Sequence, residues 1–373
     1  MIVEERVWIC DTITGAKIGL LPSDDMTWAR VLNGGAGGST TVLVNDPDVP
    51  KFIKPRDIKE VQHTLVYEAD KKVVAAGIIT STDYDKDAGT LTLGHDDLWW
   101  LLALRLAIDH GPNNSEKTIL SWTGLSLGTI IKRLLQEAVW PDRSWYALPL
   151  ALPADVSGAE ARKYFGYSYQ YIADAIRELM EVDGGPDVDF EPRWSTSDRL
   201  EYNVRMGEGM TSGKVWEINL DAPESPVSGV KRKTTTDRMT TNAYSLGEGS
   251  EKNMLVRSHP NLDPAIPAME RTEPYKTVKV AETLSKHAQE RIRALSRPTE
   301  QWSMDIFKDG ANQDSVVTLA MPRVSDLRLG DQIRIYSTAD PVLPVGWTTL
   351  RLIQFSGSLS SPDVSLQFQQ IGA

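Results

Sequence analysis

The chain has 373 residues, of which 41% are hydrophobic and 24% are charged, and its formal net charge is −11 at pH 7. This length allows two or three domains, and this composition excludes wholesale disorder because there is ample apolar surface to bury. The acidic charge argues against a surface that wraps nucleic acid, since such surfaces neutralise phosphates with basic residues. An acidic surface would instead repel DNA.

The chain also lacks the sequence features of secreted and membrane-spanning proteins. Cys10 is the only cysteine, so neither an internal disulfide nor a thiolate zinc cluster can form within one chain. The start of the chain carries Glu4 and Glu5 and has no secretory signal, which predicts assembly in the cytoplasm. The longest apolar run, 98–108, is interrupted by Arg105 and is shorter than the ~20 residues of a membrane span. No span is predicted.

Residues 1–113 are predicted to form a first β-barrel-like domain, because short apolar or alternating stretches are separated by turn residues. The segment Asn33-Gly34-Gly35 predicts a tight reversal, since Asn and Gly accept positive φ at low cost. One short helical turn is expected over residues 96–103. The predicted strands are 6–10, 17–21, 28–32, 40–44, 60–67, 73–80 and 90–93.

Residues 114–226 are predicted to form an α+β domain, because the apolar period changes from two to 3.6. Apolar residues share one face of a predicted helix over 127–138 and of a second over 169–180. Ser126 and Ser168 are the predicted N-caps of these helices. The helices can cover one face of a small sheet, whose predicted strands are 118–122, 187–194, 200–206 and 214–220.

Residues 227–373 are predicted to form a second β-rich domain with one helix, 278–295, which has an apolar stripe and ends before Pro298. A proline-rich loop is expected over 260–274. The predicted fold class is therefore mainly β with α+β, in which two β-barrel-like domains flank the α+β domain. The predicted strands are 230–236, 239–246, 252–257, 301–307, 315–321, 332–336, 348–356 and 364–369.

Four segments carry a resemblance to a known family. They are Trp28 to Asn33 with the glycine turn after it, Gly94 to Leu102, the helix from Ala281 to Pro298, and Leu327 to Ile333. They resemble parts of the hub proteins of bacteriophage tail tips and baseplates, including minor tail proteins of siphophages that infect actinobacteria. The likeness covers most of the chain and rests on pattern, since none of these segments contains a catalytic group.

The resemblance implies a structural virion protein with no enzymatic activity and no cofactor. In such a hub, three copies form a ring, and two similar β-barrel domains per chain give six near-equivalent lobes. The ring adapts the sixfold tail tube to the threefold tip. Its channel passes the end of the tape-measure protein and later the DNA, without specific DNA binding.

The resemblance also implies partners and a place of action. The partners would be two further copies of the chain, the distal tail protein, the tape-measure protein and other tail-tip proteins. The protein would be assembled in the host cytoplasm and would end at the tail tip of the virion. Many hub proteins carry a C-terminal lysin or receptor-binding extension, whereas this chain stops at Ala373 after its last predicted strand. We therefore expect no cell-wall hydrolysis.

The sharpest competing signal is a match to the nucleophile elbow of α/β-hydrolases. Gly124-Leu125-Ser126-Leu127-Gly128 lies between a predicted strand and a predicted helix, as that elbow does. The α/β-hydrolase fold needs βαβ units around the serine, whereas the sequence predicts hairpins before it and mostly strands after it. Ser126 is therefore interpreted as a helix cap, and a serine hydrolase remains an alternative. Chain order alone would allow a triad completed by Asp183, Asp187 or Asp189 and by His259 or His287.

Asp83, Asp85 and Asp87 resemble the start of a calcium-binding loop, where alternate carboxylates converge on a hard cation. Gly89 falls one residue late, and Gly94 occupies the position of the bidentate glutamate, so two ligand rules are broken. A solvated hairpin turn is the preferred interpretation, and weak calcium binding is the alternative. The five histidines have no metal-ligand spacing, so no other metal site is predicted.

One basic cluster and the many tryptophans allow further interpretations of what the protein binds. Lys231, Arg232, Lys233 and Arg238 form the cluster, and strand alternation would place Lys231 and Lys233 on one face. They are expected to solubilise a sheet edge, and the alternative is an electrostatic contact with an acidic neighbour. The 11 tryptophans allow a carbohydrate-binding tail adhesin that stacks sugars on exposed rings. Tryptophan side chains are more often buried in a protein core or in a subunit interface.

Overall fold

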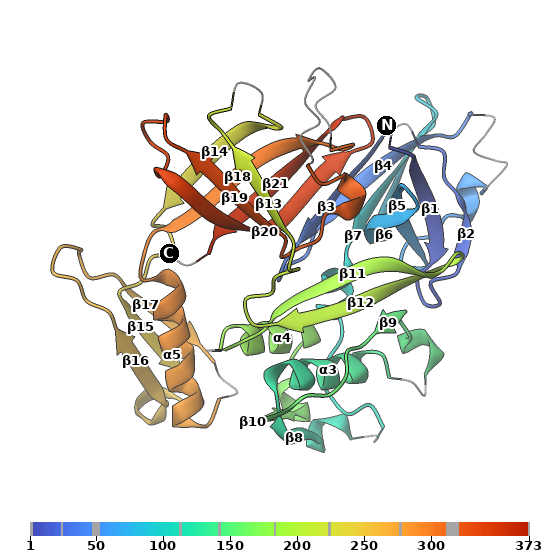
Figure 1. Cartoon of the computed structure of the whole chain (residues 1–373). Coiled ribbons are helices and arrows are strands. Elements are labelled where there is room, and N and C mark those ends of the chain that lie inside the picture. The colour runs from blue at the N-terminus through green and yellow to red at the C-terminus, as the bar shows by residue number, and fades with distance from the viewer. Residues whose placement is uncertain are drawn as a thin grey trace.

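Two strand-rich lobes lie side by side above a layer that contains helices, and a small lobe lies at one end (Figure 1). The computed structural model describes residues 3–23, 25–46, 53–111, 114–140, 143–182, 184–222, 225–275, 278–310 and 321–371. The predicted fold class, mainly β with α+β, is confirmed. No helix in these described ranges is long and apolar enough to cross a membrane.

The first strand-rich lobe, called the N-lobe, contains the first seven strands. Its strands alternate between a buried and a half-exposed face, as β7 does with Leu91 and Leu93 inside, because one face packs on the core. The short helix α2 (Leu98–Leu102) follows the lobe. The strands are β1 (Glu5–Asp11), β2 (Lys17–Leu20), β3 (Asp25–Val31), β4 (Gly37–Leu43), β5 (His63–Ala69), β6 (Lys72–Asp85) and β7 (Thr90–Asp96).

The second strand-rich lobe, called the C-lobe, is built mainly from the end of the chain. Its strand β13 comes from residues expected in the α+β domain and pairs in parallel with β19. The predicted strand 315–321 lies outside the described residues except for its last position. The strands are β13 (Val215–Asn219), β14 (Val227–Thr235), β18 (Thr299–Phe307), β19 (Gln332–Ser337), β20 (Gly346–Ser358) and β21 (Asp363–Gln370).

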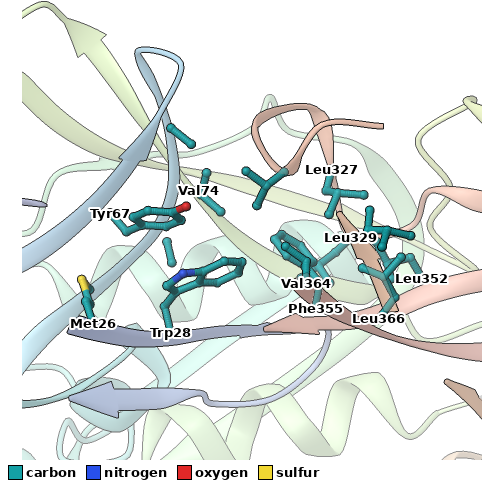
Figure 2. Close-up of a cluster of buried hydrophobic side chains, with 14 of the residues drawn as sticks. Met26, Trp28, Tyr67, Val74, Leu327, Leu329, Leu352, Phe355, Val364 and Leu366 are labelled. Carbon is teal, nitrogen blue, oxygen red and sulfur yellow. The ribbon is translucent and has the colours of Figure 1, made fainter. Parts of the chain in front are cut away.

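The two lobes share one sheet and one hydrophobic core. β3 of the N-lobe pairs with β20 of the C-lobe, which gives the continuous order β14-β18-β21-β20-β3-β4-β7-β6-β5-β1-β2. Figure 2 shows Trp28 between Tyr67 of the N-lobe and Phe355 of the C-lobe. The Trp28 ring centroid lies 5.0 Å from that of Tyr67, in a stacked arrangement, and 6.0 Å from that of Phe355, edge to face.

Both lobes repeat the same arrangement of five strands. The spatial order β3-β4-β7-β6-β5 in the N-lobe matches β14-β18-β21-β20-β19 in the C-lobe, and every neighbouring pair is antiparallel. The chain runs through the two sets in the same sequence. A short 3₁₀ turn precedes the third strand of each set, η1 (Pro55–Asp57) in the N-lobe and η6 (Val324–Asp326) in the C-lobe. The chain therefore contains a structural duplication.

The register of the longest hairpins is also repeated. β6 shifts against β7 between Ile79 and Ser81, and β20 shifts against β21 between Leu352 and Gln354. Four-residue connections, 86–89 and 359–362, follow the two long strands. The bulges and the equal connections align β6–β7 with β20–β21 residue by residue.

The layer below the lobes contains two buried helices and two small sheets. The apolar faces of α3 (Leu127–Ala138) and α4 (Ile172–Met180) pack in a second core, which also takes in one face of the β11–β12 hairpin. The strands are β8 (Ile119–Leu125) with β10 (Ser157–Phe165), and β9 (Leu150–Ala151) with β11 (Asp187–Thr196) and β12 (Arg199–Gly207). The 3₁₀ turns are η2 (Ser115–Lys117), η3 (Ser144–Tyr146) and η4 (Gly166–Ser168).

A small separate sheet and the third long helix form the end lobe, which lies at the lower left of Figure 1. Helix α5 (Ala281–Leu295) packs on this sheet through Leu284, Ala288 and Ile292. The 3₁₀ turn η5 (Glu251–Asn253) connects two of its strands. The strands are β15 (Asn242–Leu246), β16 (Val256–Pro260) and β17 (Glu270–Pro274).

The local predictions fail in a few places for physical reasons. The N-cap of α4 is Tyr171, and Ser168 instead donates its hydroxyl to the Phe165 carbonyl, so the prediction for Ser168 is wrong. The proline-rich loop contains a strand, β17, which pairs in parallel with β15. β6 extends five residues beyond its predicted end, because its last residues, Ser81 to Asp85, gain their pairing from β7.

Candidate assembly surface

The joint between the lobes is an antiparallel strand pair with two different faces. β3 and β20 pair from Gln354 opposite Val31 to Ser358 opposite Thr27. Trp28 lies on one face of this joint and is buried, as is Phe355 of the partner strand. The other face carries small or polar side chains that are half-buried or exposed. The joint therefore seals the shared core on one side and leaves a polar sheet surface on the other.

The polar surface continues across both lobes on the face opposite the core. Thr41 and Thr92 form a hydrogen bond of 3.5 Å between their hydroxyls, and Gln301 donates to Gln367 at 2.5 Å. These cross-strand pairs hold side chains that can exchange hydrogen bonds with water. Further residues of this surface are Ser39, Asp96, Ser303, Asp305, Ser356 and Ser365.

A row of carboxylates on β11 holds the helical layer against the joint. Asp187, Asp189 and Glu191, called the carboxylate row, alternate with Val188 and Phe190, which face the helices. Each carboxylate meets an arginine from the lobes: Asp187 meets Arg351 at 2.5 Å, Asp189 meets Arg30 at 2.5 Å, and Glu191 meets Arg328 at 2.6 Å. The strand thus presents charge to the lobes and apolar surface to the helices.

The central ion pair of this row is the most deeply buried. The side chains of Arg30 and Asp189 are only 8% and 3% exposed, and Arg205 adds a second contact to Asp189 at 3.1 Å. Arg205 also donates to the Leu329 carbonyl. Removing one partner of such a pair leaves an uncompensated buried charge, which costs about 3–5 kcal/mol. The pair therefore fixes the position of β11 on the joint.

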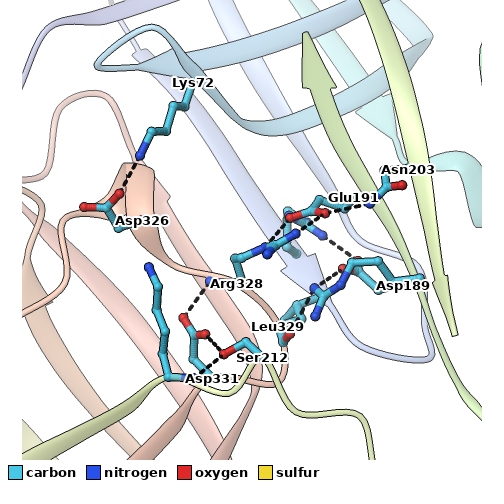
Figure 3. Close-up of polar contacts among 12 residues, drawn as sticks. Lys72, Asp189, Glu191, Asn203, Ser212, Asp326, Arg328, Leu329 and Asp331 are labelled. Atoms are coloured by element: carbon cyan, nitrogen blue, oxygen red, sulfur yellow. Dashed lines mark hydrogen bonds and ion pairs between the residues drawn. The ribbon is translucent and has the colours of Figure 1, made fainter. Parts of the chain in front are cut away.

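Glu191 and Arg328 form a two-pronged contact at the edge of the same row (Figure 3). Burial alone would raise the pKa of Glu191, but hydrogen bonds from Arg328 and Asn203 lower this pKa to about 2. Arg328 is followed in the chain by Asp331, which accepts hydrogen bonds from the Arg328 amide and the Ser212 hydroxyl. The segment around residue 328 is therefore tied both to the C-lobe and to the helical layer.

The structure gives roles to two of the sequence segments that carried the resemblance. In the segment from Trp28 to Asn33, Trp28 fills the shared core, Arg30 pairs with Asp189, and Asn33 donates to Asp187 at 2.5 Å. Asn33 adopts a φ of 63°, as its place before a glycine turn predicts. The segment around Arg328 contacts Glu191 of the same carboxylate row. Both segments therefore meet at the lobe joint.

Ser126 is a helix cap. Its side chain accepts a hydrogen bond from the Thr129 amide at 3.2 Å, and its backbone is extended, with φ −73° and ψ 158°. The strand before it belongs to a two-stranded antiparallel sheet. Of the proposed triad partners, Asp187 and Asp189 pair with arginines, His287 stacks on Tyr275, and Asp183 lies outside the described residues. The predicted cap is confirmed, and a catalytic role for Ser126 gains no supporting contact.

Asp83 and Asp85 lie at the end of β6, and Asp87 lies in the turn that leads to β7. The Asp85 carboxylate accepts hydrogen bonds from the amides of Asp87 and Ala88, at 2.8 and 2.9 Å, so it stabilises the hairpin turn. No group of three or more His, Cys, Asp or Glu side chains in the described ranges is placed to hold a metal ion. The turn matches the preferred interpretation.

The basic cluster lies at the end of the shared sheet. Lys231 and Lys233 are exposed on β14, the terminal strand, whereas Arg232 points to the other face and pairs with Glu300. The predicted edge location is thus observed. Most tryptophans pack inside or half inside the protein, and those with large exposed fractions, Trp145 at 62% and Trp347 at 48%, lie in different regions, η3 and β20.

A cleft of about 290 Å³ separates the helical layer from the end lobe. Its walls come from β8, β10 and α4 on one side and from α5 and the residues just before it on the other, including Arg162, Tyr164, Lys279 and His287. Burial, followed by the charge of Arg162, lowers the pKa of His287 to about 4. His287 is therefore neutral at physiological pH and stacks on Tyr275 with ring centroids 3.9 Å apart.

The carboxylate row was missed as a unit by the sequence reasoning, which considered Asp187 and Asp189 only as members of a triad. Its signal was present in the alternation Asp187-Val188-Asp189-Phe190-Glu191, which is typical of a strand with one charged and one apolar face. The three arginines of the lobes that meet it lie more than 120 positions away in the chain, at 30, 328 and 351. No local pattern could have paired them.

Comparison with known proteins supports this fold. No protein-family model matches the chain, and no curated protein sequence matches it. Two solved structures match almost end to end. A tail protein from Neisseria meningitidis has 13% identity and a TM-score of 0.55, covering 99% of this chain and 97% of that one. The 43 kDa tail protein of prophage MuSo2 from Shewanella oneidensis has 12% identity and a TM-score of 0.55, covering 98% of each chain.

A third match is to a chain of the lidded Francisella PdpA-VgrG complex, with 9% identity and a TM-score of 0.50, covering 99% of this chain and 53% of that one. At these identities the likeness concerns the fold. The chain has the fold of phage tail proteins, as the resemblance of its sequence segments predicted. The actinobacterial hosts stay a prediction, and so do the three domain boundaries.

Proposed function

We propose that the chain is a structural virion protein, a tail-tip hub that assembles as a homotrimeric ring and adapts a sixfold tail tube to a threefold tip. The observation that carries the proposal is the duplicated five-strand arrangement, β3-β4-β7-β6-β5 and β14-β18-β21-β20-β19, within one sheet. Two equivalent lobes per chain give six lobes in a trimer. A closed ring of this kind is the ordinary outcome of a head-to-tail contact whose rotation closes.

The polar sheet surface supports a role as channel lining. Side chains such as Thr41, Thr92, Gln301 and Gln367 carry no charge that would hold passing DNA phosphates. The net charge of −11 adds a weak repulsion between the protein and DNA. In the proposed ring this surface faces the hole, through which the end of the tape-measure protein and later the DNA pass.

The helical layer and the end lobe would lie outside the ring, held at the joint by the carboxylate row. They offer surface to neighbours, which the proposal identifies as the distal tail protein, the tape-measure protein and other tail-tip proteins of a virion assembled in the host cytoplasm. No enzymatic activity, cofactor or metal is part of the proposal. The serine hydrolase and the carbohydrate-binding adhesin remain alternatives without a contact that favours them.

The mass of the protein in solution tests the proposal. Light scattering on the chain, alone and mixed with the tail protein that follows it toward the tube, should give three chains per particle in at least one of the two samples. Electron microscopy of that particle should show six lobes around a hole. A single chain per particle in both samples, or a particle without sixfold appearance, would contradict the proposed ring.

A further inference from the structure

Several strand edges of the shared sheet, including those of β2 and β13, have no partner strand in the described part of the chain, and two of them matter for the contact between copies. One is β14, which pairs only with β18. The other belongs to residues 81–85 of β6, which pair with β7 on one edge, whereas β5 leaves the opposite edge at Ile78. Every side chain of residues 81–85 is exposed. In Figure 1, β14 lies on the left and β6 on the right.

These free edges are the counterparts of the two strands that join the lobes within the chain. β14 occupies the same place in the C-lobe as β3 in the N-lobe, and residues 81–85 occupy the same place as residues 354–358 of β20. β3 and residues 354–358 pair with each other. Their counterparts therefore have the strand geometry for the same contact and lack only a second molecule.

We propose that β14 of one copy pairs with residues 81–85 of β6 in the next copy, in the antiparallel register of the joint between β3 and β20. This inference rests on the proposed ring and specifies how its copies meet. Each copy offers one edge of each kind, so the contact is head to tail and can close a ring. All six contacts between neighbouring lobes would then have one strand geometry.

The register of β14 follows from its partner strand. Lys231 lies opposite Ser303 of β18. In the N-lobe, the counterpart of Ser303 is Ser39 of β4, whose amide donates to the Thr27 hydroxyl at 2.9 Å. Thr27 and Lys231 are therefore equivalent positions. Applied to two copies, the internal register gives the pairs Ser81–Thr235, Thr82–Thr234, Asp83–Lys233, Tyr84–Arg232 and Asp85–Lys231.

This register places opposite charges directly across from each other. Asp83 meets Lys233, and Asp85 meets Lys231, on the same face of the sheet. In the described part of the single chain, Asp83, Lys231 and Lys233 form no ion pair. Opposite charges at directly facing positions stabilise an antiparallel pair, whereas like charges destabilise it. One contact therefore accounts for both the acidic residues at the end of β6 and the basic residues of β14.

The backbone pattern favours close approach of the first charge pair. In the internal joint the Leu32 amide donates to the Ile353 carbonyl at 2.8 Å, which marks a hydrogen-bonded position. Such positions alternate along an antiparallel pair with non-hydrogen-bonded ones, where side chains are closest. Counting from Leu32, Asp83 and Lys233 occupy a non-hydrogen-bonded position, so their side chains can touch.

The other face of the contact would cover an exposed aromatic ring. Tyr84 is 56% exposed in the single chain and would lie opposite Arg232. A guanidinium over a tyrosine ring is a favourable cation–π arrangement, and Arg232 already lies 5.8 Å from the centroid of Trp302. Association would therefore bury Tyr84 between the lobes of two copies.

The same charges oppose wrong pairings. Two β14 edges facing each other would bring Lys231 and Lys233 against lysines, and two β6 edges would bring Asp83 and Asp85 against aspartates. Charged side chains on exposed edges are a known protection against edge-to-edge aggregation. The edges are thus selective for each other, and the selectivity comes from repulsion as well as attraction.

Cysteine cross-linking tests the register in the full chain. The variant Asp83→Cys with Lys233→Cys, oxidised with glutathione disulfide, should form disulfides between different copies, in a ladder that ends at three chains. The matched control is Ser81→Cys with Lys231→Cys, on the same strands and the same face. Its cysteines would be four residues out of register, about 13 Å apart, and it should link poorly. Native Cys10 is fully buried, so wild type gives the background.

The outcomes separate the register from the ring. Linked trimers in the first variant, at least about tenfold more abundant than in the control, support the proposed register. Equal linking in both variants, or no linking while wild type forms a six-lobed trimer, overturns the register and leaves the ring standing. No linking and no trimer of wild type overturns both proposals.

Charge reversal supplies an independent readout. Asp83→Lys with Asp85→Lys should lower trimer formation, and so should Lys231→Asp with Lys233→Asp, because each places like charges across the contact. Combining all four substitutions in one chain restores opposite charges and should restore the trimer. Failure of the combined variant to recover, with its thermal unfolding unchanged from wild type, would contradict the paired positions.

Discussion

The N-lobe and the C-lobe share one strand arrangement but place different side chains at matching positions. Where the N-lobe has buried Trp28, the C-lobe has Arg232, and where the C-lobe has buried Phe355, the N-lobe has exposed Thr82. The apolar members of both pairs belong to the joint within the chain. The polar members belong to the free edges. Equivalent backbone positions are therefore adapted to different environments.

The physical reason is the time at which each contact forms. The joint within the chain forms during folding, so its edges never face water in the native protein and can be apolar. The free edges face water until another molecule covers them, so they must be polar enough to resist aggregation. Charge then supplies selectivity between edges that would otherwise pair with any strand.

Truncation at the matching positions 28 and 232 tests this difference most strongly. Trp28→Ala removes a fully buried ring from the shared core and should lower the free energy of unfolding by about 3–5 kcal/mol. Arg232→Ala removes a half-exposed ion pair with Glu300 and should lower it by about 1 kcal/mol or less. Denaturant unfolding at one fixed protein concentration measures both. Equal losses would show that the two positions have the same environment.

Breaking the central ion pair of the carboxylate row should have the next largest effect. Asp189→Asn leaves Arg30 without a counter-charge in a buried site and should cost about 3 kcal/mol. Arg193→Ala is the control, because it removes an exposed pair with Glu201 on the same hairpin and should cost about 1 kcal/mol at most. Thermal and denaturant unfolding give the values. A loss at Asp189 no greater than at Arg193 would mean that the row does not hold β11.

The same row should make stability depend on acid pH. The pKa of Glu191 is lowered from 4.5 in an unfolded chain to about 2 in the fold, so its contribution is fully present above pH 4.5. As pH falls from 4.5 toward 2, the folded carboxylate becomes protonated and the contribution is lost. The unfolding free-energy difference between wild type and Glu191→Gln should therefore be largest near pH 6 and shrink by pH 3. A pH-independent difference would contradict this assignment.

The sequence predicted the positions of the strands better than it predicted which strands pair with each other. β7 and β21 alternate between apolar and polar residues, so their period predicted them. β10 and the end of β6 are polar on both faces, so no apolar period marked them. The pairing of β13 with β19 joins segments more than a hundred residues apart, and only tertiary packing decides such a pairing.

The resemblance implied two similar β-barrel domains, but their strand-by-strand correspondence could not be predicted from the residues, for a related reason. Matching positions such as Trp28 and Arg232, or Phe355 and Thr82, share a backbone geometry but no side-chain chemistry. Self-similarity in sequence is the signal by which repeats are recognised. The segments at Trp28 and Arg328 were singled out by their resemblance to the hub family, and the structure shows that they meet at the joint. The charged ends of β6 and β14 were interpreted separately, as a hairpin turn and a solubilised sheet edge.

The smallest change in the free energy of unfolding is expected just before β5 and β19 begin, where these strands no longer pair with the edges of β6 and β20. The Val61 amide donates to the Ile79 carbonyl at 2.7 Å, and the Gly330 amide donates to the Leu352 carbonyl at 2.9 Å, which are matching contacts. Both residues have positive φ, 63° at Val61 and 90° at Gly330. Only glycine adopts this conformation without steric cost.

Substituting these two residues in opposite directions should therefore change stability in opposite directions. Gly330→Ala should lower the free energy of unfolding by about 1–3 kcal/mol, because the new Cβ would lie 2.8 Å from the Met210 carbonyl oxygen at an unfavourable φ. Val61→Gly relieves about 1–2 kcal/mol of backbone strain but adds about 0.5–1 kcal/mol of chain entropy in the unfolded state, so a gain of about 1 kcal/mol or less is expected. Denaturant midpoints at constant m-value measure both changes. A loss of stability in Val61→Gly would mean that contacts of the Val61 side chain stabilise the start of β5 by more than its backbone strain costs. The matching positions before β5 and β19 would then be stabilised in different ways.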